Sequence, residues 1–170
     1  MSLPLTELTL SQAGDSIRRG DITSVALTEA TLARAEAVQP ALNCFLRIDT
    51  EAALEAADRV DTEIARGNWR GPLHGVPLAH KDVFDREGHI TTAGTILFET
   101  AATSYATVME RFDEAGAIYT GALNLDEFAA GGTGANDHYG RTHNPWNTDH
   151  ISGGSSGGSA ACVAARSVFG

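Results

Sequence analysis

The spacing of apolar residues changes at Gly71, and this change constrains the fold more than any other feature of the sequence. Before Gly71, apolar residues recur at helical spacing between recognisable capping residues. We therefore expect three helices: one that Ser11 caps and Gly20 ends after Arg19, one that begins at Thr23 or Ser24 and ends before Pro40, and one that Thr50 caps and Gly67 ends. Between the second and third helices, residues 43–48 alternate well enough to form a strand.

After Gly71, short apolar runs alternate with one further helix and with glycine-rich turns. This pattern is typical of a mixed or parallel sheet with helical crossovers. Strands are expected at residues 76–80 and 118–123, and the helix between them at residues 105–115, with Thr103 or Ser104 as its cap and Gly116 after its end. The expected fold class is therefore α/β, with N-terminal helices followed by the start of a mixed β-sheet with helical crossovers.

Charge and composition exclude several classes of partner. The chain carries 12 basic and 22 acidic side chains, for a formal net charge of −10, so it should repel phosphate backbones and anionic membranes. No apolar run reaches the roughly 18 residues of a membrane span, and the N-terminus lacks the features of a signal peptide. We expect no direct contact with nucleic acid or membrane, and a cytoplasmic location.

The cysteines and histidines do not predict a metal centre. Cys44 and Cys162 lie far apart outside any Cys-x-x-Cys pair, and the six histidines are scattered without the spacing of metal ligands. The two cysteines are most simply buried thiols in a reducing compartment. Neither a metal nor another cofactor is expected.

Residues 152–159 alternate pairs of glycine with serine and lead into a small-residue helical run at residues 160–166. A flexible linker would precede a second domain rather than a helix. An anion cradle of the P-loop type needs a lysine after the glycines, which is missing. Residues 153–157 fit the G-x-S-x-G elbow of α/β-hydrolases, but there the acid and the histidine follow the serine, and all six histidines here precede Ser155.

A serine hydroxyl can instead be activated by a neutral lysine, because burial lowers the pKa of an amine until it accepts a proton. The chain has one lysine, Lys81, at the end of the apolar run 76–80. The alternative is a lysine at a strand end that pairs with Asp82 or Asp85.

Four segments in order carry a resemblance to a known family: residues 71–82 (GPLHGVPLAHKD), 121–128 (GALNLDEF), 144–146 (NPW) and 153–161 (GGSSGGSAA). Together they resemble the amidase signature family, whose members cleave amide C–N bonds with a Ser-Ser-Lys triad. The resemblance implies that Lys81 is the triad lysine and that Ser155, after a cis peptide bond with Gly154, is the middle serine. It also implies that Ser156 orients Lys81 or Ser155, and that Ala129, Gly131 and Gly132 border the scissile amide of the substrate.

The nucleophilic serine of this family lies on the order of two dozen residues past the position of Ser155, which is beyond Gly170. The resemblance thus implies one partial domain over residues 1–170, with a helical part at 1–70 and the start of the catalytic core at 71–170. We expect a small-molecule amide as substrate and little activity or solubility in this chain alone. Two alternatives stay open: the glutamine-hydrolysing component of a tRNA-dependent amidotransferase, and a non-catalytic scaffold. The complete protein is expected as a homodimer or with amidotransferase subunits.

Overall fold

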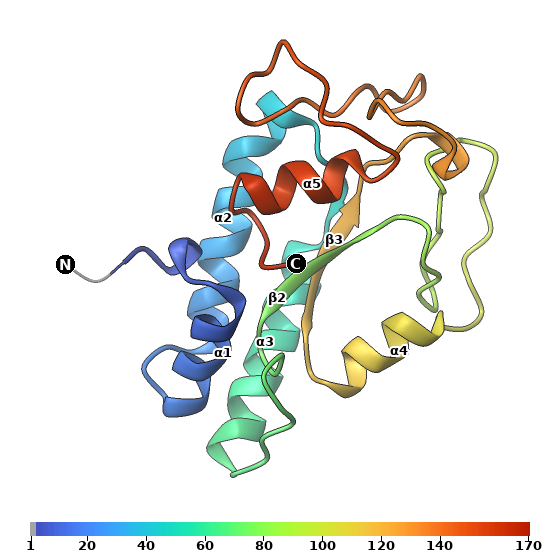
Figure 1. Cartoon of the computed structure of the whole chain (residues 1–170). Helices are drawn as coiled ribbons and strands as arrows, with labels where there is room; N and C mark the ends of the chain where they lie inside the picture. The colour runs from blue at the N-terminus through green and yellow to red at the C-terminus, as the bar shows by residue number, and fades with distance from the viewer. Residues whose placement is uncertain (1–2) are drawn as a thin grey trace.

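A computed structural model describes residues 3–170 as a mixed α/β fold (Figure 1). Its elements follow in this order: a 3-10 turn η1 (Leu5–Glu7), α1 (Leu10–Arg19), α2 (Ser24–Leu42), β1 (Phe45–Ile48), α3 (Thr50–Ala65), β2 (Pro77–Lys81), α4 (Thr107–Glu114), β3 (Ile118–Leu123), a second 3-10 turn η2 (Glu127–Ala129) and α5 (Gly157–Ala164). The fold class predicted from the sequence is confirmed.

The sheet has the strand order β1-β3-β2, in which β3 pairs antiparallel with β1 and parallel with β2. The segment β2-α4-β3 is therefore the β-α-β unit that the sequence predicts. Figure 1 shows α2 and α3 side by side next to the sheet, while α4 lies across β3 from α2 in this view. The mixed sheet thus places the ends of β2 and β3 together.

The core divides into three buried clusters around the sheet. One joins α2, the strands and α5, a second joins α1 to β2, and a third joins α2, α3 and β3. Cys44 and Cys162 are both buried free thiols in the first cluster, as the sequence predicts. The small side chains of α5 allow it to approach the sheet closely.

Two helix boundaries differ slightly from the predicted ones, and for α1 the reason is a better cap nearby. Thr9 rather than Ser11 begins α1, since its hydroxyl accepts the amide of Gln12 while the Gln12 side chain accepts the Thr9 amide. At α3, Asp49 takes the capping position and Thr50 is the first helical residue. Both changes move a boundary by one or two residues.

The prediction that α2 ends before Pro40 is wrong. The helix continues to Leu42 and ends at Asn43, which is left-handed (φ 49°) and donates its amide to the Gln39 carbonyl. The proline ring removes only the helical donor of the exposed Glu36 carbonyl, which water can replace. Burial of Leu42 in the core offsets that loss.

The later helices also begin at other positions. Helix α4 begins at Thr107 after Ala106, which offers no side-chain cap, so neither Thr103 nor Ser104 caps it. Helix α5 begins at Gly157, three residues before the predicted start at Ala160. The glycines that suggest a loop in the sequence therefore form its first turn.

The last residues of the chain lie along the edge of β2 that β3 leaves free. The Phe169 amide donates to the Pro77 carbonyl at 3.3 Å, and the Ala79 amide donates to the Gly170 carbonyl at 3.2 Å. Both segments advance in the same direction, so the pairing is parallel. Figure 1 marks the C-terminal end beside this strand. Of the helices in residues 3–170, none combines the length and apolar character needed to cross a bilayer.

Candidate active site

Lys81 is the last residue of β2, where the sheet places it opposite Leu123 of β3. Its Nζ atom lies 2.7 Å from the Oγ of Ser155 and 2.9 Å from the Oγ of Ser156. The lysine and the glycine- and serine-rich loop, which stand out separately in the sequence, therefore meet at hydrogen-bond distance.

The alternative role for Lys81, an ion pair with a neighbouring aspartate, does not agree with the structure. Among residues 3–170 no carboxylate lies within 4.0 Å of its Nζ. The Asp82 carboxylate instead accepts the amide of Thr92 at 2.9 Å and the hydroxyl of the same residue at 2.5 Å. Lys81 is left to interact with the two serine hydroxyls.

Burial lowers the pKa of Lys81 below the usual range of a lysine, while the negative charge of Asp126 acts in the opposite direction. The net effect increases the fraction of neutral amine near neutral pH. A neutral amine has a free lone pair, so it can accept a proton from a hydroxyl. The site thus combines a potential base with a hydroxyl at the distance that proton transfer requires.

The loop that carries Ser155 is fixed by its connection to α5. The Gly154–Ser155 peptide bond is cis, and α5 begins two residues later at Gly157. The Gly158 amide donates to the Asn124 carbonyl at 3.0 Å. A side chain at Gly158 would lie 2.5 Å from the backbone oxygens of Cys44 and Asn124, so only glycine allows this close approach. The end of β3 therefore sets the position of both serines.

Asp126 belongs to the site, although sequence reasoning assigns it no role. The residue is only 3% exposed, and its backbone amide donates to the Ser155 carbonyl at 3.1 Å. The signal in the sequence is an acidic residue three positions after the buried strand β3. Its burial depends on two glycine loops that come together only in the folded chain.

The three predicted substrate-binding residues lie on an exposed loop beside Asp126. Ala129 has a left-handed backbone (φ 56°) and donates its amide to the Asp126 carbonyl at 2.9 Å. Gly131 lies against the Asp126 carboxylate, whereas Gly132 has no neighbouring residue within 4 Å of the place of a Cβ. The structure brings this loop to the Ser155 loop; contact with a substrate stays a prediction.

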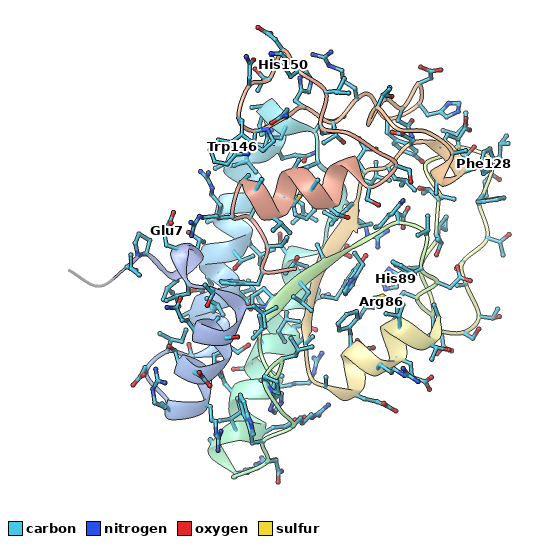
Figure 2. All side chains as sticks on the ribbon, in the orientation of Figure 1. Glu7, Arg86, His89, Phe128, Trp146 and His150 are labelled. Carbon is cyan, nitrogen blue, oxygen red and sulfur yellow. The ribbon has the colours of Figure 1, made fainter. Side chains whose placement is uncertain are left out.

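An aromatic pair borders the same loop. Phe128 is 51% exposed and its ring meets that of Phe98 edge to face, with the centroids 6.1 Å apart. Figure 2 shows Phe128 at the rim of the molecule, on the side away from α1. Within residues 3–170 no three His, Cys, Asp or Glu side chains gather as metal ligands would.

Comparisons with known proteins identify the family of this chain. The family model for amidases matches residues 26–170. The chain is 46% identical over 163 residues to the A subunit of glutamyl-tRNA(Gln) amidotransferase from Methylococcus capsulatus, and 47% identical over 162 residues to its counterpart from a Roseiflexus species. In both cases the match covers 95% of this chain and 33% of the relative. The chain thus spans about a third of the length of these relatives.

Solved structures of similar fold include a peptide amidase and a protein from a vestigial complex. The native peptide amidase of Stenotrophomonas maltophilia superposes with a TM-score of 0.90 at 33% identity, over 97% of this chain and 35% of that one. An inhibitor-bound protein, described as part of a vestigial complex that reveals the origins of an s-triazine catabolic enzyme, gives a TM-score of 0.91 at 40% identity, over 95% and 36%. With the family model matching most of its residues, the chain belongs to the amidase family, the amidase signature enzymes.

Proposed function

We propose that the complete protein hydrolyses the C–N bond of a linear carboxamide through a proton relay that contains Lys81 and Ser155. The observation that carries this proposal is the 2.7 Å separation between Lys81 Nζ and Ser155 Oγ. Membership of the amidase family supports amide cleavage as the reaction. The retained contact between the two groups argues against a scaffold released from catalysis.

In the proposed relay, proton transfer first runs from the nucleophilic serine toward Lys81 and then back from Lys81 toward the amide nitrogen. Neutral Lys81 accepts a proton from Ser155 as Ser155 accepts one from the nucleophilic serine, whose oxygen bonds to the amide carbon. The tetrahedral intermediate collapses when the proton returns through Ser155 to the amide nitrogen, which leaves as an amine or ammonia. Water then attacks the acyl-enzyme by the same route and releases the carboxylic acid. Ser156, at 2.9 Å from Lys81, holds the amine in line with Ser155.

In this proposal the nucleophilic serine follows Gly170 in the chain. Its hydroxyl must come close to Ser155, which lies beside Lys81 at the end of β2. The parallel pairing of Phe169 and Gly170 with β2 supports this placement, because it leads the chain along the strand that ends at Lys81. In this proposal Ala129, Gly131 and Gly132 border the scissile amide. The 170-residue chain alone then has no activity.

The similarity to amidotransferase subunits supports glutamine as a candidate substrate of the complete protein. Identity to the two amidotransferase chains is 46–47%, against 33% to the peptide amidase. In this second candidate function the complete protein releases ammonia from glutamine and works with other subunits that pass it to a charged tRNA. The relay of Lys81 and Ser155 is the same in both candidates, and only the acyl group and the acceptor differ.

The test is amide hydrolysis by the 170-residue chain and by a version extended through the missing serine, each with glutamine and with aryl amides. We expect turnover only in the extended protein, and a loss of at least about 10²-fold in Lys81→Met and Ser155→Ala. Ser159→Ala is the matched control, because Ser159 lies on α5 without a side-chain hydrogen bond among the described residues. Activity of the short chain, or full activity of Ser155→Ala, would contradict the proposal.

A further inference from the structure

Asp126 is a buried carboxylate whose hydrogen bonds do not account for its burial. Its Oδ2 accepts the amide of Thr133 at 3.2 Å, but its Oδ1 is buried without a donor among residues 3–170. A buried acceptor that lacks a donor costs free energy, and a charged one costs more. The hydrogen bonds of the Asp126 side chain therefore do not explain why this carboxylate is buried.

Two glycines make room for this carboxylate. A Cβ at Gly131 or at Gly154 would collide with the Asp126 Oδ2. Gly131 belongs to the loop that is predicted to border the substrate, and Gly154 directly precedes Ser155. The carboxylate thus fills a cradle between the substrate loop and the serine loop, and any larger residue at either position would expel it.

The backbone of Asp126 is tied to the same two loops. Its amide donates to the Ser155 carbonyl at 3.1 Å, and its carbonyl accepts the Ala129 amide at 2.9 Å. Asp126 follows β3 at the end where Leu123 lies opposite Lys81. Its side chain and backbone together hold the serine loop over the end of β2.

Asp126 is also the charged group that acts on Lys81. Its negative charge opposes the lowering of the Lys81 pKa by burial. The groups that face Lys81 from the α5 side are the neutral hydroxyls of Ser155 and Ser156. Directly after this strand, the Asp82 carboxylate accepts hydrogen bonds from the amide and hydroxyl of Thr92. Among residues 3–170 no carboxylate forms a direct ion pair with Lys81.

We propose that Asp126 is a positioning residue that acts through Lys81 and Ser155: it holds the serine loop over Lys81, and its charge stabilises the ammonium ion that forms when Lys81 takes up the proton. In this proposal the unpaired Oδ1 destabilises the fold, and the negative charge is kept because it acts on the Lys81 amine without forming an ion pair with it. The catalytic meaning of this inference rests on the proposed function, whereas the coupling of Asp126 to Lys81 does not. A purely structural Asp126 would serve only as acceptor for Thr133.

The single lysine of the chain makes a direct test possible. Lysine labelled with an NMR-active carbon at Cε gives one side-chain signal, which reports the protonation of Lys81 as the pH is raised. Asp126→Asn keeps the shape and the acceptor for Thr133 but removes the charge. Asp61→Asn is the matched control, because Asp61 accepts the amides of Ser24 and Val25 at 2.7 and 3.0 Å at the start of α2, away from Lys81.

We expect the titration midpoint of Lys81 to fall in Asp126→Asn by on the order of one pH unit and to stay unchanged in Asp61→Asn. An unchanged midpoint in a folded Asp126→Asn protein would overturn the proposal. Should this variant unfold as a 170-residue chain, the same substitution in the extended protein is tested by the pH dependence of kcat/KM. A shift of its acidic limb to lower pH supports the proposal, and a lower rate with an unmoved limb overturns it. Because the NMR titration needs no turnover, its result stands even if the hydrolysis assay fails.

Discussion

Lys81 Nζ and Ser155 Oγ lie 2.7 Å apart although 74 positions separate the two residues in the sequence. Two elements bring them together: the sheet, which ends β2 at Lys81, and the first turn of α5, which packs against the end of β3. Since neither residue is held by a salt bridge, the position of the pair depends on this packing. The protonation of Lys81 and the packing that holds Lys81 and Ser155 together can therefore be tested by separate experiments.

The rate of hydrolysis should depend on pH through Lys81. Burial lowers the pKa of this lysine, and only the neutral amine accepts a proton. In the extended protein we expect kcat/KM to rise with pH and to level off below the ordinary lysine value of 10.5. The measurement is the pH–rate profile on an aryl amide. A rate that falls as pH increases through this range would rule out a neutral lysine as base.

Gly158→Ala should destabilise the protein and disturb the site together. The new Cβ would lie 2.5 to 2.6 Å from backbone atoms of Cys44 and Asn124, which cannot move independently of the sheet. We expect a loss of about 2 kcal/mol in the free energy of unfolding, measured with urea. Gly132→Ala is the control, because nothing lies within 4 Å of its Cβ position. Equal stability of the two variants would show that α5 does not pack as closely as described.

Asn124→Ala should have a comparable effect for a different reason. This fully buried side chain donates to the carbonyls of Asn43 and Gly140, each at 3.0 Å, and accepts the Leu125 amide at 2.8 Å. Its removal leaves the buried Leu125 amide without an acceptor and takes one donor from each of the two carbonyls, so we expect a loss of about 2 kcal/mol. Asn68→Ala, at an exposed site, should change the stability by less than about 0.5 kcal/mol. A cost for Asn124→Ala as small as that of the control would contradict the hydrogen-bond network.

His80 should make stability depend on pH. It stacks on Phe112 and Tyr119, and burial, with the charge of Arg86, lowers its pKa to about 4. Between about 4 and the ordinary value of 6.5 the unfolded chain binds a proton that the folded chain does not. The contribution of His80 is therefore complete above pH 6.5 and decreases as the pH falls toward 4, by no more than about 3 kcal/mol.

The check for His80 is urea unfolding at several pH values. His80→Phe keeps an aromatic ring in the stack but cannot titrate, so its stability should fall less on acidification than that of the original protein. His150→Phe, at an exposed position at the top of Figure 2, should keep the original pH dependence. Identical acid sensitivity in all three proteins would show that His80 is not the group responsible.

Local patterns predicted much of the fold. The strand at residues 118–123 has the predicted bounds, and the β-α-β unit follows from the order of its apolar runs. The antiparallel pairing of β1 with β3 could not be predicted, because an isolated alternating run does not show which strand it joins. The continuation of α2 past Pro40 was missed for a similar reason, since the burial of Leu42 is a tertiary effect.

Parts of the site could be predicted to different degrees. Lys81 stood out as the only lysine, and the family resemblance linked it to Ser155 before any distance was known. Asp126 could not be recognised in the same way. Its burial requires Gly131 and Gly154, 23 positions apart in the chain, to come together around one carboxylate. Such a three-dimensional cradle has no local signature.

The most direct test of the proposed relay is the titration of Lys81 in the unmodified chain, followed by the single Cε signal of labelled lysine. Burial beside two neutral hydroxyls predicts a midpoint clearly below 10.5 in the folded protein and a return to that value in urea. This result would establish Lys81 as an amine that is ready to accept a proton from Ser155. A midpoint at or above 10.5 in the folded chain would mean that Lys81 stays charged, and would contradict the proposed relay.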